Sequence, residues 1–299
     1  GLIGLFLQPV QLSWISLFVE SLKNYKFGFV IPFLILHLMC LGVFFFPFKW
    51  EYVALLAVNY TVGMFFVTAS YHRYFSHRSY ELNRFWQFIF AFMAQMSMQK
   101  GVLWWAANHR DHHRYSDTEK DIHSPVQKGF FYSHIGWILT NEHDEYDSNR
   151  IKDFFKFPEL RFLDRYHWIP TTVLAVSLYL IGGWAYFFWG WVLSVIVLAH
   201  CTFTINSLAH VWGSRRFRTS DDSRNNFFLA ILTLGEGWHN NHHYCMYSCR
   251  QGIRWYEVDI TYYVLRLLSF VGIVKGIRPF RYGKDWTGEP GPERIEAAA

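Results

Sequence analysis

Residues 52–77 read YVALLAVNYTVGMFFVTASYHRYFSH, an apolar run that ends in two histidines, His72 and His77. Its first part, Tyr52–Ser70, contains no Lys, Arg, Asp or Glu. A helix needs about 20 apolar residues to cross a bilayer, because each residue adds about 1.5 Å. The run therefore predicts a membrane-spanning helix that carries histidines at its polar end.

The composition of the 299 residues agrees with a membrane protein, since 52% are hydrophobic, 21% aromatic and only 17% charged. In a soluble domain about a quarter of the residues are usually charged. The net charge of +5 is modest and there is no long basic run, which argues against a nucleic-acid partner. A small positive charge fits a surface that lies against anionic lipid headgroups.

Three further apolar stretches lead us to expect an all-α integral-membrane fold with four transmembrane helices. The expected spans are residues 29–46, 52–70, 169–189 and 190–209. Spans one and two are joined by Pro47–Glu51, and spans three and four by a turn around Trp189–Gly190, so each pair forms an antiparallel hairpin. Residues 1–282 are expected to form one domain, with a helical cytoplasmic cap from residues 71–168 and 210–282, and residues 283–299 a disordered tail.

The distribution of Lys and Arg predicts the orientation in the membrane. Of the 28 such residues, only Lys49 falls on the side of the two short turns. By the positive-inside rule, both termini and both cap segments are cytoplasmic. A fifth apolar stretch, Phe85–Trp105, is interrupted by polar residues, and as a crossing it would put later histidines on the opposite side from His72. We therefore expect it to lie at the interface or in the cap.

Nine of the 15 histidines fall in four short windows, all next to the membrane on this cytoplasmic side. The windows are His72-Arg-Tyr-Phe-Ser-His77, His109-Arg-Asp-His112-His113, Asn206-Ser-Leu-Ala-His210 and His239-Asn-Asn-His242-His243. The topology is derived from Lys and Arg alone, so the position of all four histidine windows on one side of the membrane is an independent observation. One such window could arise by chance, but four on the same side of the membrane predict a metal site.

The spacing within the windows favours helices that aim imidazoles at a common point. Positions i, i+3 and i+4 share one helix face, so His109, His112 and His113 are expected to converge, as are the three histidines of the last window. His72 and His77 are five residues apart, which suits a helix end or bend. Nine imidazoles are too many for one metal ion and suit two, with iron, copper, zinc and nickel all compatible with this ligand type.

The remaining histidines are interpreted as ordinary core or surface residues, with His123 close enough to the second window to support it. They are His37, His123, His134, His143, His167 and His200. No acidic or histidine pair lies mid-span, which disfavours a transporter. Metal-bound imidazoles need hydrogen-bond acceptors on their second nitrogen. The candidate acceptors beside the windows are Asp111, Asp117, Asp121, Asp221, Asp222 and Glu236.

The HxxxxH, HxxHH and HxxHH boxes, with the added Asn206-x-x-x-His210, resemble the membrane fatty acyl desaturases of the stearoyl-CoA desaturase type. The resemblance covers about Tyr52–Ile277, and residues 235–252 look most similar to the bacterial and plant branches. It implies a mushroom-shaped fold with two irons held by nine histidines and by a water on Asn206. It also implies a reaction that uses O2 and two electrons to introduce a cis double bond, of the Δ9 type, into a long acyl chain.

The resemblance further implies a kinked acyl tunnel. Gln99, Thr202 and Phe203 are expected at its bend, and Tyr60 is a candidate chain-length stop, although ordinary helix packing also explains Tyr60. Arg, Asp and Lys residues that contact coenzyme A in animal relatives are replaced here by Ala107, Asn108, Asn141 and Glu142. Lys100 and Asn108 are the candidate contacts to the headgroup or carrier. The loss of these phosphate contacts weakens the case for acyl-CoA, so an acyl group on a membrane lipid competes with acyl-CoA and the carrier stays open.

No haem-binding segment follows Ile277, so the electrons are expected from a separate ferredoxin, rubredoxin or cytochrome b5-like protein. We expect this donor to dock around Arg215, Arg216 and Arg218. The boxes favour a bacterial inner membrane. Two other functions compete with a desaturase: a hydroxylase of an alkane, sterol or lipid with the same metal site, and a membrane metal carrier or haem-binding protein.

Overall fold

The computed structural model describes residues 25–283, and every regular element in that range is a helix. The long and medium helices are α2 (Phe27–Met39), α3 (Trp50–Phe66), α4 (Arg84–Gln95), α5 (Val102–Tyr115), α9 (Pro158–Arg165), α10 (Trp168–Tyr186), α11 (Ser194–Asn206) and α14 (Ile260–Phe270). The short ones are α6 (Pro125–Lys128), α7 (Trp137–Leu139), α8 (Lys152–Phe155), α12 (Phe227–Leu232) and α13 (His239–Tyr244). The expected all-α fold is confirmed for the described residues. Apart from Gly283, the expected disordered tail lies outside them.

Shorter 3₁₀- and π-helical segments extend or connect these helices. They are η1 (Cys40–Phe45), η2 (Val67–Ser76), η3 (Tyr132–Gly136), η4 (Ser148–Ile151), η5 (Phe187–Leu193) and η6 (Leu208–His210). Among them, η2, η3 and η5 are π-helical. A π-helix is rare and is often found at functional sites, and η2 directly continues α3 into the first histidine window.

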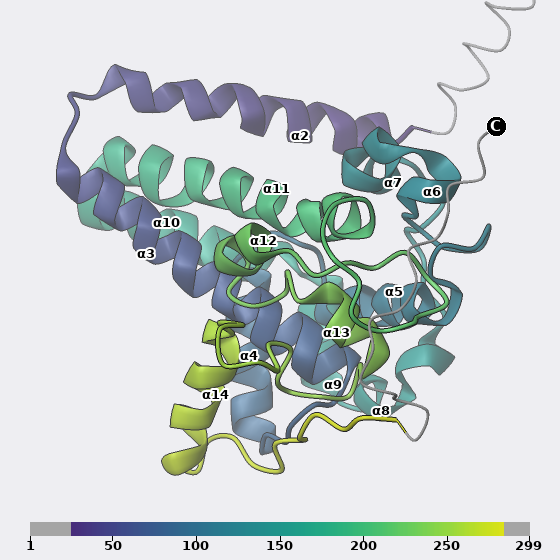
Figure 1. The fold of residues 1–299 in the computed structure, drawn as a ribbon. Helices are drawn as coiled ribbons and strands as arrows, with labels where there is room; N and C mark the ends of the chain where they lie inside the picture. Colours follow the sequence, from purple (N-terminus) through teal and green to yellow (C-terminus); the bar gives the residue numbers. More distant parts are fainter. Residues whose placement is uncertain (1–24, 284–299) are drawn as a thin grey trace, which may run out of the picture.

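Three continuous helical stretches are long and apolar enough to cross a bilayer: Phe27–Phe45, Trp50–Ser76 and Trp168–His210. The first two overlap the expected spans 29–46 and 52–70. Figure 1 shows α2, α3, α10 and α11 running side by side, with the shorter helices gathered at one end of the group. The apolar side chains of α2 are largely exposed, among them Ile31, Leu34 and Leu38, as expected of a helix surrounded by lipid.

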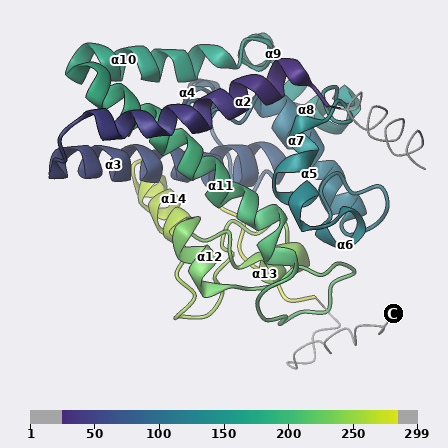
Figure 2. The ribbon, with the colours of Figure 1, turned by 90° about the horizontal axis from the view of Figure 1, so that it is seen from above.

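The third stretch, 43 residues long, reverses direction within its length. Gly182 (φ −138°, ψ 17°) and Gly183 (φ 65°, ψ −155°) leave the helical conformation inside α10. Figure 2 shows α10 running away from α9, turning back at its far end and returning as α11. The expected turn at Trp189–Gly190 is therefore wrong, because these residues lie in η5. Only glycine readily adopts the conformation of Gly183, so the glycine pair sets the turn in a run that is apolar throughout.

The fifth apolar stretch of the sequence does not form a crossing helix. Its first part is α4, whose 12 residues are too few to span a bilayer. The chain then bends, with Met98 and Lys100 at positive φ (62° and 65°), and α5 begins after Gly101. This bend turns the chain so that α5 brings the second histidine window back towards η2.

The main hydrophobic core lies where η2 and the end of α3 meet α4, α5 and α9. Met64, Phe75, Phe90, Leu103 and Leu163 are all buried in it. Apolar burial of this kind stabilises the fold by about 25 cal/mol per Å², and here it packs together the three helices that carry the first two histidine windows. The core therefore positions the candidate site as well as the fold.

A buried arginine ties η2 to the C-terminal part of the chain. The guanidinium of Arg73, 1% exposed, donates to Glu236 at 2.9 Å, to Asp259 at 2.9 Å and to the carbonyl oxygen of Cys249 at 2.7 Å. Charge-assisted hydrogen bonds of this kind are strong in a low-dielectric interior. They fix the end of the first histidine helix against the segment that carries the last histidine window.

Candidate metal centre

The structure brings all nine histidines of the four windows into two neighbouring groups. In the first group, here called the five-histidine cluster, the ligand nitrogens all lie within 4.8 Å of one another. Its members are His72, His77, His109, His113 and His242. The second group, the four-histidine cluster, meets the same distance limit and consists of His112, His210, His239 and His243. Seven of these nine side chains are less than 9% exposed and belong to the protein interior.

The two HxxHH windows each contribute to both clusters, which corrects the expectation that each aims at one point. On α5, His109 and His113 join the five-histidine cluster while His112 joins the other. On α13, His239 and His243 join the four-histidine cluster. The reason is helical geometry: at about 100° per residue, position i+3 lies about 60° to one side of position i, and i+4 about 40° to the other. Each window therefore bridges the two clusters.

The π-helical turn of η2 explains the five-residue spacing of the first window. The backbone N–H of His77 donates to the carbonyl oxygen of His72 at 3.2 Å, an i to i+5 hydrogen bond. The two rings consequently lie with their centroids 4.8 Å apart. In an α-helix, residues five apart would diverge, so the wider turn is what directs both rings into one cluster.

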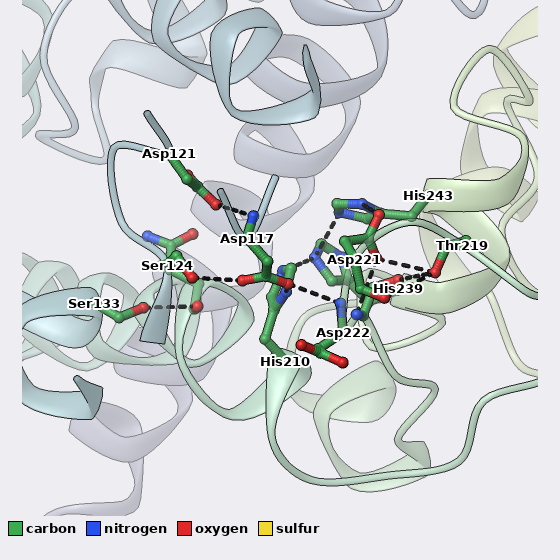
Figure 3. Close-up of polar contacts among 12 residues, drawn as sticks. Asp117, Asp121, Ser124, Ser133, His210, Thr219, Asp221, Asp222, His239 and His243 are labelled. Atoms are coloured by element: carbon green, nitrogen blue, oxygen red, sulfur yellow. Dashed lines mark hydrogen bonds and ion pairs between the residues drawn. The ribbon is translucent and has the colours of Figure 1, made fainter. Parts of the chain in front are cut away.

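Carboxylates hold the second ring nitrogen of four of the histidines. The Nδ1 atoms of His210, His112 and His243 lie 2.8, 2.9 and 2.9 Å from carboxylate oxygens of Asp117, Asp121 and Asp221, in that order. Figure 3 shows Asp117 between His210 and the backbone N–H of Asp222, with Asp221 beside His243. In the same way, Nδ1 of His72 contacts Glu236.

Two of the expected acceptors do not reach a histidine ring. Asp111 pairs with Arg150 at 2.7 Å, and the side chain of Asp222 pairs with Arg215 at 3.3 Å. For the other four carboxylates the expectation is confirmed. Since an ionised carboxylate only accepts hydrogen bonds, it places the proton of each ring on Nδ1 and leaves Nε2 with a free lone pair.

The Nε2 atoms of each cluster face one another at distances that are compatible with a bound metal ion. In the five-histidine cluster, His72–His242, His242–His113, His113–His109 and His109–His77 are separated by 3.0, 2.9, 3.0 and 3.0 Å between Nε2 atoms. A neutral imidazole can donate from Nε2 to only one neighbour, so hydrogen bonds satisfy at most two of these four contacts. The remaining lone pairs face each other without a proton between them.

A metal ion fits these distances. With metal–nitrogen bonds of about 2.1 Å, two ligands at about 90° are separated by about 3.0 Å, whereas tetrahedral ligands would be about 3.4 Å apart. The Nε2 atoms of His210 and His243 each lie 3.1 Å from Nε2 of His239, so the four-histidine cluster has the same spacing. The spacing of the ring nitrogens is thus compatible with a metal ion held by several imidazoles in each cluster.

Burial keeps most of these rings neutral. Desolvation lowers the pKa of His77, His109, His113, His239 and His242 well below the ordinary value for histidine, and the neighbouring rings lower it further. Metal ligation requires an unprotonated ring nitrogen. The five rings therefore meet this requirement at neutral pH.

Contacts between histidines and carboxylates at the edge of the clusters shift the pKa values of both partners. Burial lowers the pKa of His112, but the carboxylate of Asp121 outweighs it and the pKa is raised. Burial alone would raise the pKa of Glu236, and the contact with the ring of His72 together with the positive charge of Arg73 brings it down to about 2. A cation bound between the rings reverses the tendency of His112 to protonate.

Three adjoining cavities lead past the five-histidine cluster. The outer cavity is lined by α2 (Phe29, Phe33, Leu36) and by α11, and the inner and deep cavities both reach His109. Trp105 lines all three, and neighbouring cavities share further lining residues, so together they form one path. The deep cavity also touches His72 and ends among side chains of α3 and η2.

The expected tunnel residues lie along this path. Gln99 and Phe203 line both the outer and the inner cavity, and Thr202 and Asn206 line both the inner and the deep one. The side-chain amide of Gln99 donates to Thr202 Oγ1 at 3.0 Å. Tyr60 does not line these cavities. Its hydroxyl donates to the carbonyl oxygen of Leu232 at 2.6 Å.

The two candidate carrier contacts lie at different depths. Lys100 lines the outer cavity, and its ammonium lies 3.1 Å from Asp144 and 4.1 Å from the ring centroid of Trp104. Burial and the neighbouring Lys26 lower the pKa of Lys100 to about 7. Asn108 is 8% exposed and lines the inner cavity, with its amide donating to the carbonyl oxygen of Trp104 at 2.9 Å.

A comparison with protein-family models decides the family. Residues 48–268 match the family model described as fatty acid desaturase. The chain belongs to the fatty acid desaturase family. The matched range includes all four histidine windows, so the resemblance seen in the sequence is confirmed.

Curated relatives of this desaturase differ in regiochemistry and acyl carrier. An acyl-CoA C20 Δ5-desaturase of Anemone leveillei is 38% identical over 81% of this chain and 78% of its own length. A chloroplastic palmitoyl-monogalactosyldiacylglycerol Δ7 desaturase of Arabidopsis thaliana is 35% identical over 86% of this chain and 70% of its own. An sn-1 stearoyl-lipid 9-desaturase of Anabaena variabilis is 34% identical over 77% and 85%. The names of these relatives thus include Δ5, Δ7 and Δ9 positions and both acyl-CoA and acyl-lipid substrates.

Of the three arginines expected to dock the electron donor, Arg218 is exposed and the other two are paired within the fold. The side chains of Arg215 and Arg216 are only 7% and 15% exposed. Arg215 donates to the carbonyl oxygen of Asp221 at 2.7 Å, and Arg216 pairs with Glu257. Both guanidiniums hold loops of the cap together, because basic residues next to carboxylates in the sequence pair internally.

Sequence reasoning missed two residues of the desaturase site that a spacing argument could have found. Trp105 stacks on His109 with centroids 4.8 Å apart and planes at 22°. It precedes His109 by four residues and so shares its helix face. Met64 lines the deep cavity, one helical turn beyond Tyr60. His123, whose ring lies 4.4 Å from that of His112, supports the cluster as expected.

Proposed function

We propose that this chain is an O2-dependent acyl desaturase that introduces a cis double bond, of the Δ9 type, into a long acyl chain. Two iron ions would be held by the nine histidines, one in each cluster, and a water on Asn206 would complete the coordination of one iron. The observation that carries the proposal is the path of cavities that passes His72 and His109. It brings an apolar chain to the edge of the five-histidine cluster.

The chemistry explains why such a site needs metals. An unactivated methylene has no acidic proton, so acid–base groups alone cannot open it. The irons, when bound, would supply the reduction of O2 by two electrons that removes the two hydrogens. In the balanced reaction, one saturated carbon pair, one O2, two electrons and two protons give one double bond and two waters.

The protein's own residues would hold the chain and exclude water. Trp105, packed on Tyr71 and His109, forms a rigid wall along the whole path. The hydrogen bond between Gln99 and Thr202 pairs two of the polar groups that line the inner cavity, which makes this part of the wall less polar towards methylene groups. Positioning of one carbon pair within about 3–3.5 Å of the reacting atoms contributes much of the rate.

A membrane lipid is the acyl carrier that this arrangement supports best. The outer cavity lies between α2 and α11, which both belong to candidate membrane spans, so a lipid-borne chain would reach it from within the bilayer. Lys100, which lines the outer cavity, would contact the ester group of the lipid or a phosphate of its headgroup. The relatives named as lipid desaturases agree with this, and acyl-CoA, the substrate in the name of the Anemone relative, is the alternative.

The proposed topology has four membrane spans with both termini and the metal centre cytoplasmic. Its support is the reversal at Gly182–Gly183, which divides the 43-residue stretch into two antiparallel helices. The near absence of Lys and Arg on the opposite side supports the orientation. Because the relatives include a chloroplastic enzyme as well as one from Anabaena variabilis, the proposal extends to any membrane whose inner side carries the electron donor.

The proposed function is tested by expression in a host without this activity, followed by mass spectrometry of lipid and thioester pools. The predicted product is a Δ9 cis-alkene in a membrane lipid and no oxygenated product. A hydroxylated chain would instead support the hydroxylase. Haem absorption with no lipid product would favour a haem-binding protein.

A further inference from the structure

A depression on the side of the five-histidine cluster away from the acyl path has an unusual lining. Two cluster histidines, His77 and His113, form part of its wall. Six cationic side chains surround them and only one carboxylate, Asp153. The cations are Arg78, Arg110, Arg114, Arg150, Lys152 and Arg278. The acyl path touches His72 and His109 instead, so the cluster is approached by two different surfaces.

The cations of this depression differ in how they are held. Arg110 is fixed, with two hydrogen bonds of 2.9 Å to Asp153 and one of 2.9 Å to the carbonyl oxygen of Ser76. Arg150 pairs with Asp111 at 2.7 Å. Lys152 and Arg278 are exposed at the rim. The fixed pairs shape the depression, and the rim supplies excess positive charge.

The lining does not fit an acyl chain or a neutral ligand. Excess charge of one sign around a concave surface concentrates partners of the opposite sign and raises the rate of encounter. Interfaces between transient redox partners are small. A depression lined by few residues is sufficient for such an interface. A redox group seated here would be separated from the metal position by a single imidazole ring of His77 or His113.

We propose that this depression is the docking surface for an acidic one-electron carrier protein. The inference rests on the proposed function, because only a site that consumes electrons needs such a partner. At each docking the reduced carrier loses one electron, which passes through His77 or His113 to the metal centre. Two dockings supply the two electrons that, with two protons, one O2 and one saturated carbon pair, give the double bond and two waters.

The test reverses the charge of the exposed rim. In the double variant Lys152→Glu/Arg278→Glu, neither residue belongs to the metal or acyl site. The matched control is Arg161→Glu/Arg266→Glu, two exposed arginines on α9 and α14 that do not line the depression. Both variants change the net charge equally. An acidic [2Fe–2S] ferredoxin with its reductase serves as the carrier, and dithionite as a small reductant that needs no docking surface.

The expected result is a rise of about tenfold or more in the KM for ferredoxin at low ionic strength in the rim variant, with the control near wild type. The difference shrinks as salt screens the charges, since the Debye length is about 10 Å at 0.1 M. Iron content and dithionite-driven single turnover stay at the wild-type level. This unchanged turnover separates a docking defect from a damaged metal centre.

Three results would overturn the inference. One is a ferredoxin KM in the rim variant equal to that of the control. Another is an effect on the KM for the acyl substrate alone, which would assign the depression to a lipid headgroup. A third is loss of dithionite-driven turnover. If the reduced wild-type enzyme forms no alkene at all, the proposed function fails and the docking surface with it.

Discussion

The carboxylate partners of the histidines show how single residues tune the site. Asp117, 1% exposed in its side chain, accepts from the Nδ1 of His210, the backbone N–H of Asp222 and the hydroxyl of Ser124. An ionised acceptor raises the basicity of the metal-facing Nε2 and fixes the ring orientation. The four-histidine cluster has this support at three of its four rings, through Asp117, Asp121 and Asp221.

For Asp117→Asn we predict a selective loss of metal at the four-histidine cluster. The amide keeps the size of the side chain but removes the charge, and loss of such a partner typically costs roughly 10- to 100-fold in metal affinity. The measurement is iron content per chain at limiting free iron. Asp111→Asn is the control, since Asp111 pairs with Arg150 and contacts no histidine ring. Equal iron loss in the two variants would contradict the assignment.

Met64 and Tyr60 give opposing predictions for chain length. Met64 lines the end of the acyl path, whereas Tyr60 precedes it by one turn of α3 and donates to the carbonyl oxygen of Leu232. Met64→Trp should therefore shift the products towards shorter chains, with a change in selectivity on the order of 10- to 200-fold per methylene. Tyr60→Phe should leave the profile unchanged. Product analysis on a series of acyl chain lengths decides between them, and the reverse pattern would restore Tyr60 as the stop.

At the scale of helices, the residue types of the site could be predicted but not their division between two clusters. The four windows identify all nine histidines, because imidazoles at i, i+3 and i+4 signal metal binding on any helix. Which cluster each ring joins depends on the rotation of α5 and α13 about their axes. That rotation is set by core contacts such as those of Leu103, which no local pattern encodes.

Two features of the backbone could not be predicted from hydropathy. The π-helical turn of η2 brings His72 and His77 together, although their spacing alone indicates only an irregular helix end. The turn of the α10–α11 hairpin lies at Gly182–Gly183 because the turn needs a backbone conformation that only glycine adopts readily. Both are local departures from α-helix inside runs whose composition is uniform.

Gly183→Ala should destabilise the α10–α11 hairpin by about 1–3 kcal/mol, because alanine rarely adopts φ 65° and ψ −155°. Space is not the cause, since a Cβ at Gly183 would meet no atom within 4 Å. Gly28→Ala is a matched control with equally open space, in the first turn of α2. There alanine should stabilise by up to about 0.5–1 kcal/mol. Unfolding in detergent, followed by circular dichroism, measures the stability of both variants. Equal changes in the free energy of unfolding would contradict this explanation of the turn.

Three histidines outside the two clusters, His37, His134 and His200, connect α2 to α11 and η3, and the expectation of no histidine pair within the spans is wrong. His37 Nε2 lies 2.9 Å from His200 Nε2, and His200 Nδ1 lies 3.2 Å from His134 Nε2. A double-mutant cycle with His37→Phe and His200→Phe should give a coupling of about 0.6 kcal/mol, and at most about 1.7 kcal/mol, as for other hydrogen bonds between membrane helices. Thermal unfolding in detergent measures the cycle. Zero coupling would show that the two rings do not support each other.

At the scale of the whole molecule, the metal centre separates two approaches. The acyl path reaches it between helices that belong to candidate spans, and the basic depression reaches it from the cap. Composition and hydropathy predicted an all-α chain with helices long and apolar enough to cross a membrane. They could not predict the two approaches, because these depend on residues from α2, α5, α8 and α11 that only the folded chain brings together.

The orientation predicts which positions are reachable from each side of the membrane. Phe48, in the turn between η1 and α3, is 61% exposed, and Arg254 is exposed in the cap. In intact cells, an impermeant maleimide should label Phe48→Cys but not Arg254→Cys, which should react only after permeabilisation. Wild type supplies the background from its four native cysteines. Labelling of both positions from one side would refute the topology.

The central claim is that nine imidazoles from four separate windows surround two irons. Anomalous X-ray scattering at the iron edge, from crystals of the iron-loaded protein, tests it most directly. The account predicts two iron peaks per chain, one among the five Nε2 atoms of His72, His77, His109, His113 and His242, and one among those of His112, His210, His239 and His243. A single peak, or a peak outside these two groups, would contradict it.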